Sequence, residues 1–346
     1  SRQSRGLGDV YKRQQLRSKE ISNQKLLKYL KFCEDKNQGN LITFFEITTV
    51  AAFKAFQESR ADYLILETGL GGRFDATNIL KKSKYAAITP ISLDHQDYLG
   101  NSLDQIAFEK LGILNSKSTI FINQQKTNVM KYIKSQLKKR KLTANLFNNH
   151  WKIKSNFYLS NDIRVNLSKL SLLGSHQLIN AGLAIHLARN ILKEKFVIEK
   201  TEKALMNCEW PGRLQQIKSG ILNKKIKKYK NIYLDGFHNI DGMKAFIKSL
   251  PKNRKILICS FLNNKKYIQM LSNLSNHFNK IIVVKMNEEN SITEDLLPKY
   301  LKLYFANSLT DSFKMINKLS SNQTTIYFGG SLYFIGEVIK LNRLKN

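Results

Sequence analysis

Short apolar runs alternate along the chain with stretches in which apolar residues recur at helical spacing. Apolar runs typical of buried strands lie at 62–67, 85–91, 118–123, 231–235, 255–260, 280–285 and 325–328. Helical spacing is found at 15–36, 47–60, 103–114, 174–195, 240–250, 265–277, 308–319 and 332–341. Strands that alternate with helices of this length predict βαβ units and a mostly parallel sheet. We therefore expect an α/β fold.

Some segments depart from this alternation and indicate how the chain is divided. Residues 146–173 contain short alternating segments, which predict an antiparallel flank. The Trp-Pro-Gly-Arg sequence at 210–213 interrupts the pattern, so we expect one domain at 15–209 and a second at 210–346. The basic run from Lys224 to Lys230 predicts a solvated hairpin. Residues 1–14 lack periodicity and are expected to be non-native or disordered.

Composition limits the classes of protein that fit. The net charge is +31, but the excess is mostly lysine spread over the whole chain without a nucleic-acid-binding motif, so a nucleic-acid partner is not expected. No apolar run approaches the ~20 residues that a membrane span needs. Cys33, Cys208 and Cys259 are scattered and odd in number, which fits a reducing cytoplasm.

Ionisable residues follow the first two predicted strands. Glu67 ends the 62–67 run and precedes a glycine-rich turn, His95 follows the 85–91 run, and Lys110 lies within an apolar helical face. Ligands gather at the carboxyl ends of strands in open α/β sheets, so Glu67 and His95 are candidate metal ligands. The alternatives are a solvated Glu67, a structural His95 and a Lys110 whose stem lies along apolar surface while its head reaches water.

A second group of candidates lies near the expected domain boundary. Asp235 and His238 sit where a predicted strand turns into a helix, so both can point at a ligand. Arg213 follows a Trp-Pro-Gly turn that would fix its direction, and a guanidinium there suits phosphate groups. The alternative for Arg213 is a linker residue in a surface ion pair.

These fragments resemble one family in order along the chain. The matching blocks are TFFEIT (43–48), ETGLGGRFDATN (67–78), ITPISLDHQDYLG (88–100), IAFEKLGI (106–113), GSHQLINAGLAI (174–185), WPGRLQ (210–215), DGFHN (235–239) and FGGSLYFIGE (328–337). The chain resembles folylpolyglutamate synthase/dihydrofolate synthase, a relative of the Mur ligases. The resemblance implies a Mur-ligase-like ATPase domain, incomplete at its N-terminus, followed by a smaller Rossmann-like α/β domain that ligates glutamate.

The resemblance also implies an activity. Family members use ATP and Mg²⁺ to convert a carboxylate of dihydropteroate or a folate into an acyl phosphate, which the amino group of L-glutamate then attacks. The implied partners are therefore these small molecules, with no nucleic acid and no membrane, for a monomer in the cytoplasm. A Mur-type ligase acting on a cell-wall precursor is the alternative enzyme.

Individual roles follow from the matched positions. The resemblance implies Mg²⁺ ligands at Glu67 and His95 and a carbamylated, catalytic lysine at Lys110, with His238 beside the nucleotide at the domain interface. It assigns the pterin site to Thr43, Phe44, Phe45, Glu46, Phe74, Asp75 and Ala76. It assigns nucleotide contacts to Asn180, Arg213 and Asp235.

One departure from the family bears on activity. Family members carry a phosphate-binding loop that ends in Gly-Lys-Ser, upstream of the TFFE block. No Gly-Lys-Ser or Gly-Lys-Thr occurs in the 346 residues. We therefore expect an N-terminally truncated member that is inactive as it stands, or a nucleotide-binding remnant without turnover.

Overall fold

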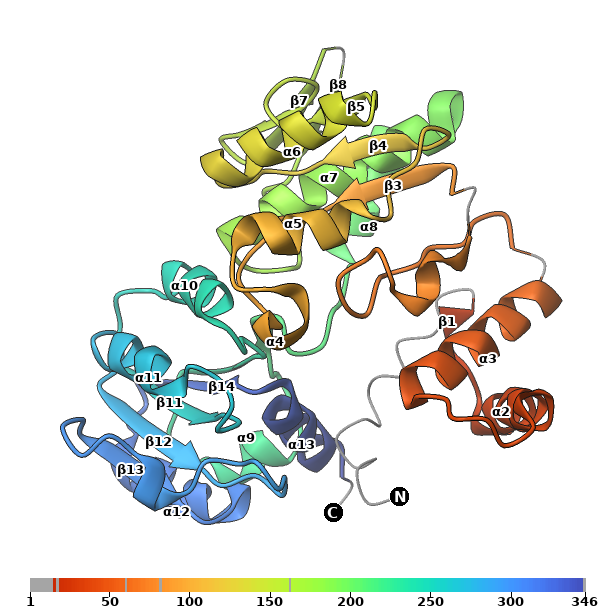
Figure 1. The fold of residues 1–346 in the computed structure, drawn as a ribbon. Coiled ribbons are helices and arrows are strands. Elements are labelled where there is room, and N and C mark those ends of the chain that lie inside the picture. Colours follow the sequence, from red (N-terminus) through yellow and green to blue (C-terminus); the bar gives the residue numbers. More distant parts are fainter. Residues whose placement is uncertain (1–14, 17–18, 60, 81–82, 162, 345–346) are drawn as a thin grey trace. The chain divides into compact units, whose positions relative to one another are not determined.

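The structure is a computed structural model that describes residues 15–16, 19–59, 61–80, 83–161 and 163–344 (Figure 1). Contacts divide the chain into two compact units, Ser1–Leu146 and Phe147–Asn346. The predicted domains, 15–209 and 210–346, were drawn from the sequence pattern alone and stay a prediction. The expectation for residues 1–14 lies outside the described residues.

The first unit contains a parallel sheet with the order β3 (Tyr85–Ile88), β4 (Thr119–Ile122) and β5 (Ala144–Leu146). The helices α5 (Leu103–Leu111) and α6 (Thr127–Lys139) follow β3 and β4 along the chain. Both helices bury their apolar residues against the sheet in one cluster, which includes Ile106, Ile120 and Ile133. The predicted βαβ pattern is confirmed here.

The predicted strand at 62–67 is wrong. Among the described residues no strand pairs with this segment, and its apolar side chains face solvent, with Ile65 92% exposed. A strand exists only where a neighbouring strand accepts and donates its backbone hydrogen bonds. An apolar run indicates that a segment suits a sheet, but it cannot show that a neighbour is present.

A helical hairpin precedes this segment. It consists of α2 (Asn23–Asn37) and α3 (Phe44–Glu58), which pack through Tyr29 and Cys33 on α2 and small alanines on α3. The predicted helix from Gln15 begins too early, because the short strands β1 (Gln15–Leu16) and β2 (Lys19–Glu20) come first. The Ser22 side chain then accepts a hydrogen bond from the Lys25 amide and starts α2.

The second unit begins with an antiparallel sheet, β6 (Lys152–Lys154), β7 (Phe157–Ser160) and β8 (Ile163–Asn166). The predicted antiparallel flank is therefore confirmed. The next elements are α7 (Ser175–Leu192), η3 (Lys193–Lys195) and α8 (Ile198–Met206). His186 of α7 stacks on Trp151 with ring centroids 4.4 Å apart and bonds the Tyr158 hydroxyl, which fastens α7 to this sheet.

A larger sheet forms the rest of the second unit, with all neighbours parallel except the edge strand β9. Its order is β13 (Leu303–Ala306), β12 (Lys280–Val284), β11 (Lys255–Ser260), β14 (Thr325–Gly330), β10 (Asn231–Asp235) and β9 (Gln215–Gln216). Its helices are α9 (Ile221–Lys225), α10 (Ile240–Lys248), α11 (Tyr267–Ser275), η4 (Glu294–Leu296), α12 (Leu309–Leu319) and α13 (Leu332–Arg343).

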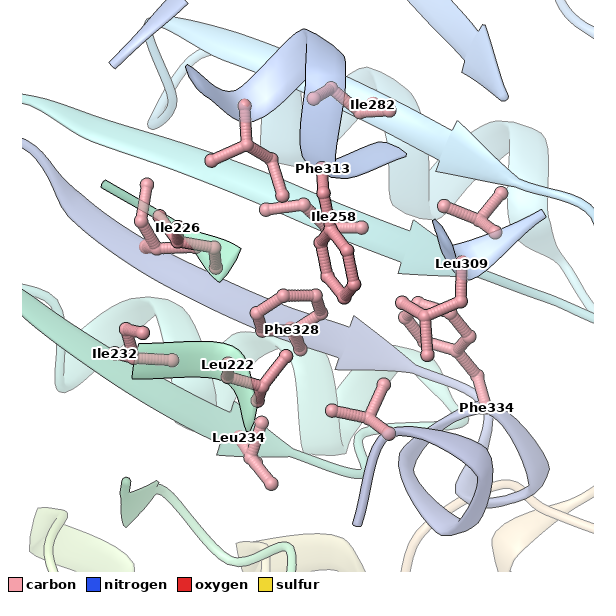
Figure 2. Packing of buried hydrophobic residues seen from close by; sticks show 14 of the residues in the cluster. Leu222, Ile226, Ile232, Leu234, Ile258, Ile282, Leu309, Phe313, Phe328 and Phe334 are labelled. Atoms are coloured by element: carbon pink, nitrogen blue, oxygen red, sulfur yellow. The ribbon is translucent and has the colours of Figure 1, made fainter. Parts of the chain in front are cut away.

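Helices cover both faces of this sheet. On one face, residues of α9, α12 and α13 such as Leu222, Phe313 and Phe334 pack against Phe328 and Ile258 of the central strands (Figure 2). On the other face, residues of α10 and α11 form a second cluster. Burial on both faces explains why every residue of β11 and β14 is buried and why these strands read as continuous apolar runs.

The predicted hairpin at Lys224 to Lys230 is wrong. Its first two residues end the helix α9, and Ile226 is fully buried in the core of the sheet. The apolar residues between the lysines do not form an exposed face, because Ile226 attaches this segment to the core of the larger sheet. None of the described helices is long and apolar enough to cross a membrane.

Candidate functional site

The glycine-rich segment of the first unit is organised by one carboxylate. Asp75 is 7% exposed, and one of its oxygens accepts hydrogen bonds from the amides of Gly69 and Leu70, each at 2.8 Å. The other oxygen accepts from the amide and hydroxyl of Thr77 at 2.9 and 2.6 Å. Asp75 thereby joins the two ends of a tight loop, 69–77, and caps the 3₁₀ turn η2 (Ala76–Ile79).

This loop lies directly against the C-terminal end of α5. A Cβ atom on Gly72 would lie 2.9 Å from the carbonyl oxygen of Glu109, and one on Gly112 would lie 2.4 Å from the Cα of Arg73. Only residues without a side chain allow two backbones to approach this closely. The glycines of the loop therefore serve contact with the helix that carries Lys110.

Lys110 lies within electrostatic reach of three carboxylates. Burial lowers the pKa of its ammonium group, because the charged form loses hydration. The carboxylates of Asp94, Asp75 and Glu67 lie near enough to act on that pKa in the opposite direction. The structure thus brings together two residues predicted from the sequence, Glu67 and Lys110, and adds Asp94 to them.

His95 follows Asp94 in an unusual backbone conformation. Its φ of 50° is left-handed, the Asp94 side chain accepts a hydrogen bond from its amide, and its ring is exposed before the short helix α4 (Gln96–Leu99). Strained backbone in a non-glycine residue is often retained where function requires a particular direction of the side chain. The assignment of His95 as a metal ligand stays a prediction.

The fit of a cation depends on the available donors. Among the described residues, no group of three or more His, Cys, Asp or Glu side chains is arranged to hold a metal ion. The oxygens of Glu67 and Asp94 are donors that Mg²⁺ prefers, whereas those of Asp75 are taken by the loop. A Lys110 ammonium would repel a cation, so the donor set fits Mg²⁺ only if Lys110 is neutral or carbamylated.

The two segments predicted to bind a pterin lie side by side. The ring of Phe45 approaches Gly69 so closely that a Cβ there would lie 2.3 Å from it. Thr43 and Glu46 bond each other in a capping box at the start of α3, so both have a structural task. Phe74 is 83% exposed and Phe44 is partly exposed. The pterin contacts of these residues, and that of Ala76, stay predictions.

Asp235 of the second unit is buried at the end of β10. It accepts a hydrogen bond from the Leu214 amide at 2.9 Å, while the Gly236 amide donates to the Gly212 carbonyl. Burial raises the pKa of Asp235 to about 6, and the nearby Arg213 guanidinium opposes this rise. The Trp-Pro-Gly-Arg turn is therefore fastened to the strand end that carries Asp235.

Some of the other residues predicted to bind the nucleotide lie near the Trp-Pro-Gly-Arg turn. His238 lies close enough to lower the pKa of Asp235, and its Nδ1 is 3.3 Å from the Gly236 carbonyl oxygen. His176, at the start of α7, is half-buried near Arg213, and this burial lowers its pKa. Asn180 is exposed one turn later on the same face of α7. Nucleotide binding by Arg213, Asp235 and Asn180 stays a prediction.

Comparison with known proteins assigns the family. A family model described as the Mur ligase middle domain matches residues 15–188, half of the 346 residues. The chain belongs to the Mur ligase family. A protein named dihydrofolate synthase/folylpolyglutamate synthase from Bacillus subtilis is 28% identical over 336 residues, covering 90% of this chain and 74% of that relative.

Solved structures agree on the fold. Mycobacterium tuberculosis folylpolyglutamate synthase complexed with ADP aligns with a TM-score of 0.81 at 22% identity, over 94% of this chain and 80% of that one. A bifunctional folylpolyglutamate synthase/dihydrofolate synthase with Mn, AMPPNP and L-glutamate bound aligns at 0.80 and 20% identity, over 95% and 79%. The predicted α/β fold with a Mur-ligase-like sheet is confirmed.

Several residues that lie beside the candidate residues were not predicted from the sequence. Asp94 stands in the DHQ sequence beside the predicted His95, and His176 stands in the GSHQ sequence beside the predicted Asn180. Both were inside matched blocks, so their position was a usable signal. Arg73 and Glu109 also lie in matched blocks, but their contact joins positions 36 apart along the chain, and no pattern in the sequence indicates it.

Proposed function

We propose that the chain is an ATP-dependent acid–amino-acid ligase that joins L-glutamate to dihydropteroate, a folate, or both, in contrast to the inactive member that we expected from the sequence alone. The observation that carries this proposal is the gathering of Glu67, Asp94 and Lys110 where a glycine-rich loop meets α5. The named activity of the B. subtilis relative and the bound ligands of the solved neighbours support it.

The reaction divides into two steps. A carboxylate oxygen of the acceptor attacks the γ-phosphorus of ATP and ADP leaves. The glutamate nitrogen then attacks the acyl carbon and phosphate leaves. Phosphoryl transfer depends mostly on positioning and charge neutralisation. When bound, Mg²⁺ supplies that neutralisation. Glu67 and His95 would hold it.

Lys110 and the second unit complete this assignment. A carbamate on Lys110 would turn a half-buried cation into a carboxylate beside the metal, and the lowered pKa of Lys110 favours the neutral amine that reacts with CO₂. In the second unit, the Arg213 guanidinium suits the nucleotide phosphates, and His238 lies beside Asp235 at that position. We assign the chain to the cytoplasm, because its three free cysteines suit a reducing compartment, and we propose that it acts as a monomer.

The acceptor is tested by equilibrium binding, which needs no turnover. Dihydropteroate, tetrahydrofolate and a uridine-diphosphate-linked muramoyl precursor are titrated separately against the chain, with tryptophan fluorescence or calorimetry as the readout. We expect binding of dihydropteroate or tetrahydrofolate and none of the muramoyl precursor. Binding of the muramoyl precursor alone would identify a cell-wall ligase instead.

A second candidate function is a nucleotide-binding chain without turnover. The observation that favours it is the absence of Gly-Lys-Ser and Gly-Lys-Thr from the 346 residues, because a phosphate-binding loop needs its lysine and hydroxyl. Such a chain would bind ADP through the Arg213 turn and would consume no ATP when all substrates are present.

The variant Asp235→Asn is expected to lower the affinity for ADP and to raise the free energy of unfolding. The folded-state pKa of Asp235 is raised to about 6, above its ordinary value of 3.8, so its contribution to the free energy of unfolding falls as the pH rises from about 4 to about 6. The variant should lack this fall and be up to about 3 kcal/mol more stable at pH 7.5. ADP affinity should drop about tenfold, as for loss of one hydrogen bond to a charged group.

Urea unfolding at pH 4.5 and pH 7.5, with ADP titrated at pH 7.5, measures both effects. Asp241→Asn, a neighbour in the first turn of α10, is the control and should change neither. Unchanged ADP affinity in Asp235→Asn would remove Asp235 from the nucleotide site.

A further inference from the structure

We propose that Arg73 and Glu109 form a positioning pair that fixes where Lys110 lies relative to Glu67 and Asp94. The inference deepens the proposed function and rests on it for the role of Lys110. Neither residue was a candidate from the sequence, and neither needs to touch a substrate. Their task is to fasten the glycine-rich loop to the end of α5.

The contact has both a side-chain and a backbone part. Arg73 Nη2 donates to Glu109 Oε1 at 2.7 Å and Arg73 Nε donates to Oε2 at 3.2 Å, a two-bond geometry that defines a direction as well as a distance. The Arg73 amide also donates to the Glu109 carbonyl oxygen at 2.8 Å. Three hydrogen bonds therefore join these two residues.

Two aromatic rings lie near the Arg73 guanidinium. The Arg73 guanidinium carbon lies 4.2 Å from the ring centroid of Phe74 and 4.9 Å from that of Phe108. Phe108 precedes Glu109 on α5, so one guanidinium contacts the loop and the helix together. The side chain of Glu109 is 18% exposed and that of Arg73 is 42% exposed, so the ion pair is shielded from solvent on the Glu109 side only.

The position of the pair gives it a consequence for chemistry. Glu109 immediately precedes Lys110, and Arg73 lies two residues before Asp75, the carboxylate that closes the loop. Gly72 and Gly112 let the two backbones touch, and Asn78 Nδ2 donates to the Gly112 carbonyl oxygen at 3.4 Å. The Arg73–Glu109 hydrogen bonds add a side-chain contact that fixes the register of the loop on the helix. Residues that orient a site from outside it typically change metal affinity or activity 10–100-fold when replaced.

The test compares Arg73→Gln and Glu109→Gln with a matched control, Lys54→Met. Lys54 also makes an ion pair, with Glu58 at 3.3 Å, and also lies over a ring, that of Phe32, but it belongs to α3. One readout is the dissociation constant for Mn²⁺ by electron paramagnetic resonance. The other is the rate at which Lys110 is acetylated, followed by peptide mass spectrometry, which needs no metal. Thermal unfolding verifies that each variant is folded.

We expect both glutamine variants to bind Mn²⁺ at least tenfold more weakly and to acetylate Lys110 several-fold faster, with Lys54→Met at the wild-type value for both. The double variant Arg73→Glu with Glu109→Arg should recover part of each loss, because it restores an ion pair. Lower thermal stability with unchanged Mn²⁺ affinity and unchanged acetylation would overturn the proposal. If wild type itself binds no Mn²⁺, the metal site of the proposed function fails, and the acetylation rates alone decide the positioning role.

Discussion

Replacing Asp75 with alanine is expected to collapse the glycine-rich loop and abolish metal binding by the first unit. The carboxylate satisfies the amides of Gly69, Leu70 and Thr77 and the hydroxyl of Thr77. Each hydrogen bond to a charged acceptor contributes roughly 1.5–3 kcal/mol, and water recovers part of that in a loop, so we expect a net loss of about 3–5 kcal/mol. The free energy of unfolding from urea titration and Mn²⁺ affinity measure the result.

Two further variants serve as an intermediate substitution and as a control. Asp75→Asn keeps one carbonyl oxygen as an acceptor and should lie between wild type and alanine in stability. Asp62→Ala removes an exposed carboxylate from the preceding segment and should change the free energy of unfolding by less than about 0.5 kcal/mol. A fully stable Asp75→Ala variant with normal Mn²⁺ affinity would show that the loop needs no central carboxylate.

Glu67→Gln is expected to separate metal binding from stability most sharply. Glu67 is exposed, and its substitution keeps the shape of the side chain while removing the charge. Loss of a direct ligand should exceed the 10–100-fold effect of outer residues, so we expect Mn²⁺ affinity to fall more than about 100-fold and turnover to be abolished. The free energy of unfolding should change by less than about 0.5 kcal/mol.

The control for Glu67→Gln is Glu34→Gln, which removes an exposed carboxylate from α2 in the same unit. It should bind Mn²⁺ with the wild-type affinity. Normal Mn²⁺ binding by Glu67→Gln would withdraw the metal assignment and leave Asp94 as the candidate carboxylate beside Lys110.

The sequence predicted best the strands whose residues are nearly all buried, because such strands appear as continuous apolar runs. β11 and β14 are buried on both faces, so their apolar runs marked them correctly. The segment 62–67 has the same kind of run, but without a described neighbouring strand it remains irregular and exposed. β13 was missed because its residues are mostly half-buried at the edge of the sheet. Pairing, unlike burial, depends on residues far away in the chain.

The candidate site shows the same division. Glu67, His95 and Lys110 were predicted from their place after strands and from matched blocks, and the structure brings Glu67 and Lys110 together. The sequence grouped Asp75 with pterin contacts, whereas the structure gives its oxygens to the loop itself. The partners of Glu67 and Asp75 depend on how the glycine-rich loop packs against α5. Tertiary contacts of that kind leave no periodicity in a sequence.

The central claim is that this chain joins glutamate to a pteroyl acceptor at the expense of ATP. An omission series with Mg-ATP, dihydropteroate or tetrahydrofolate, and labelled L-glutamate measures ADP release and label in the pteroyl product. The account predicts labelled product and repeated turnover of ATP only when all three substrates are present. Without glutamate, the first step alone should yield at most about one ADP per enzyme molecule. Repeated ADP release without the acceptor or without glutamate, or complete substrates that yield no labelled product, would contradict the account.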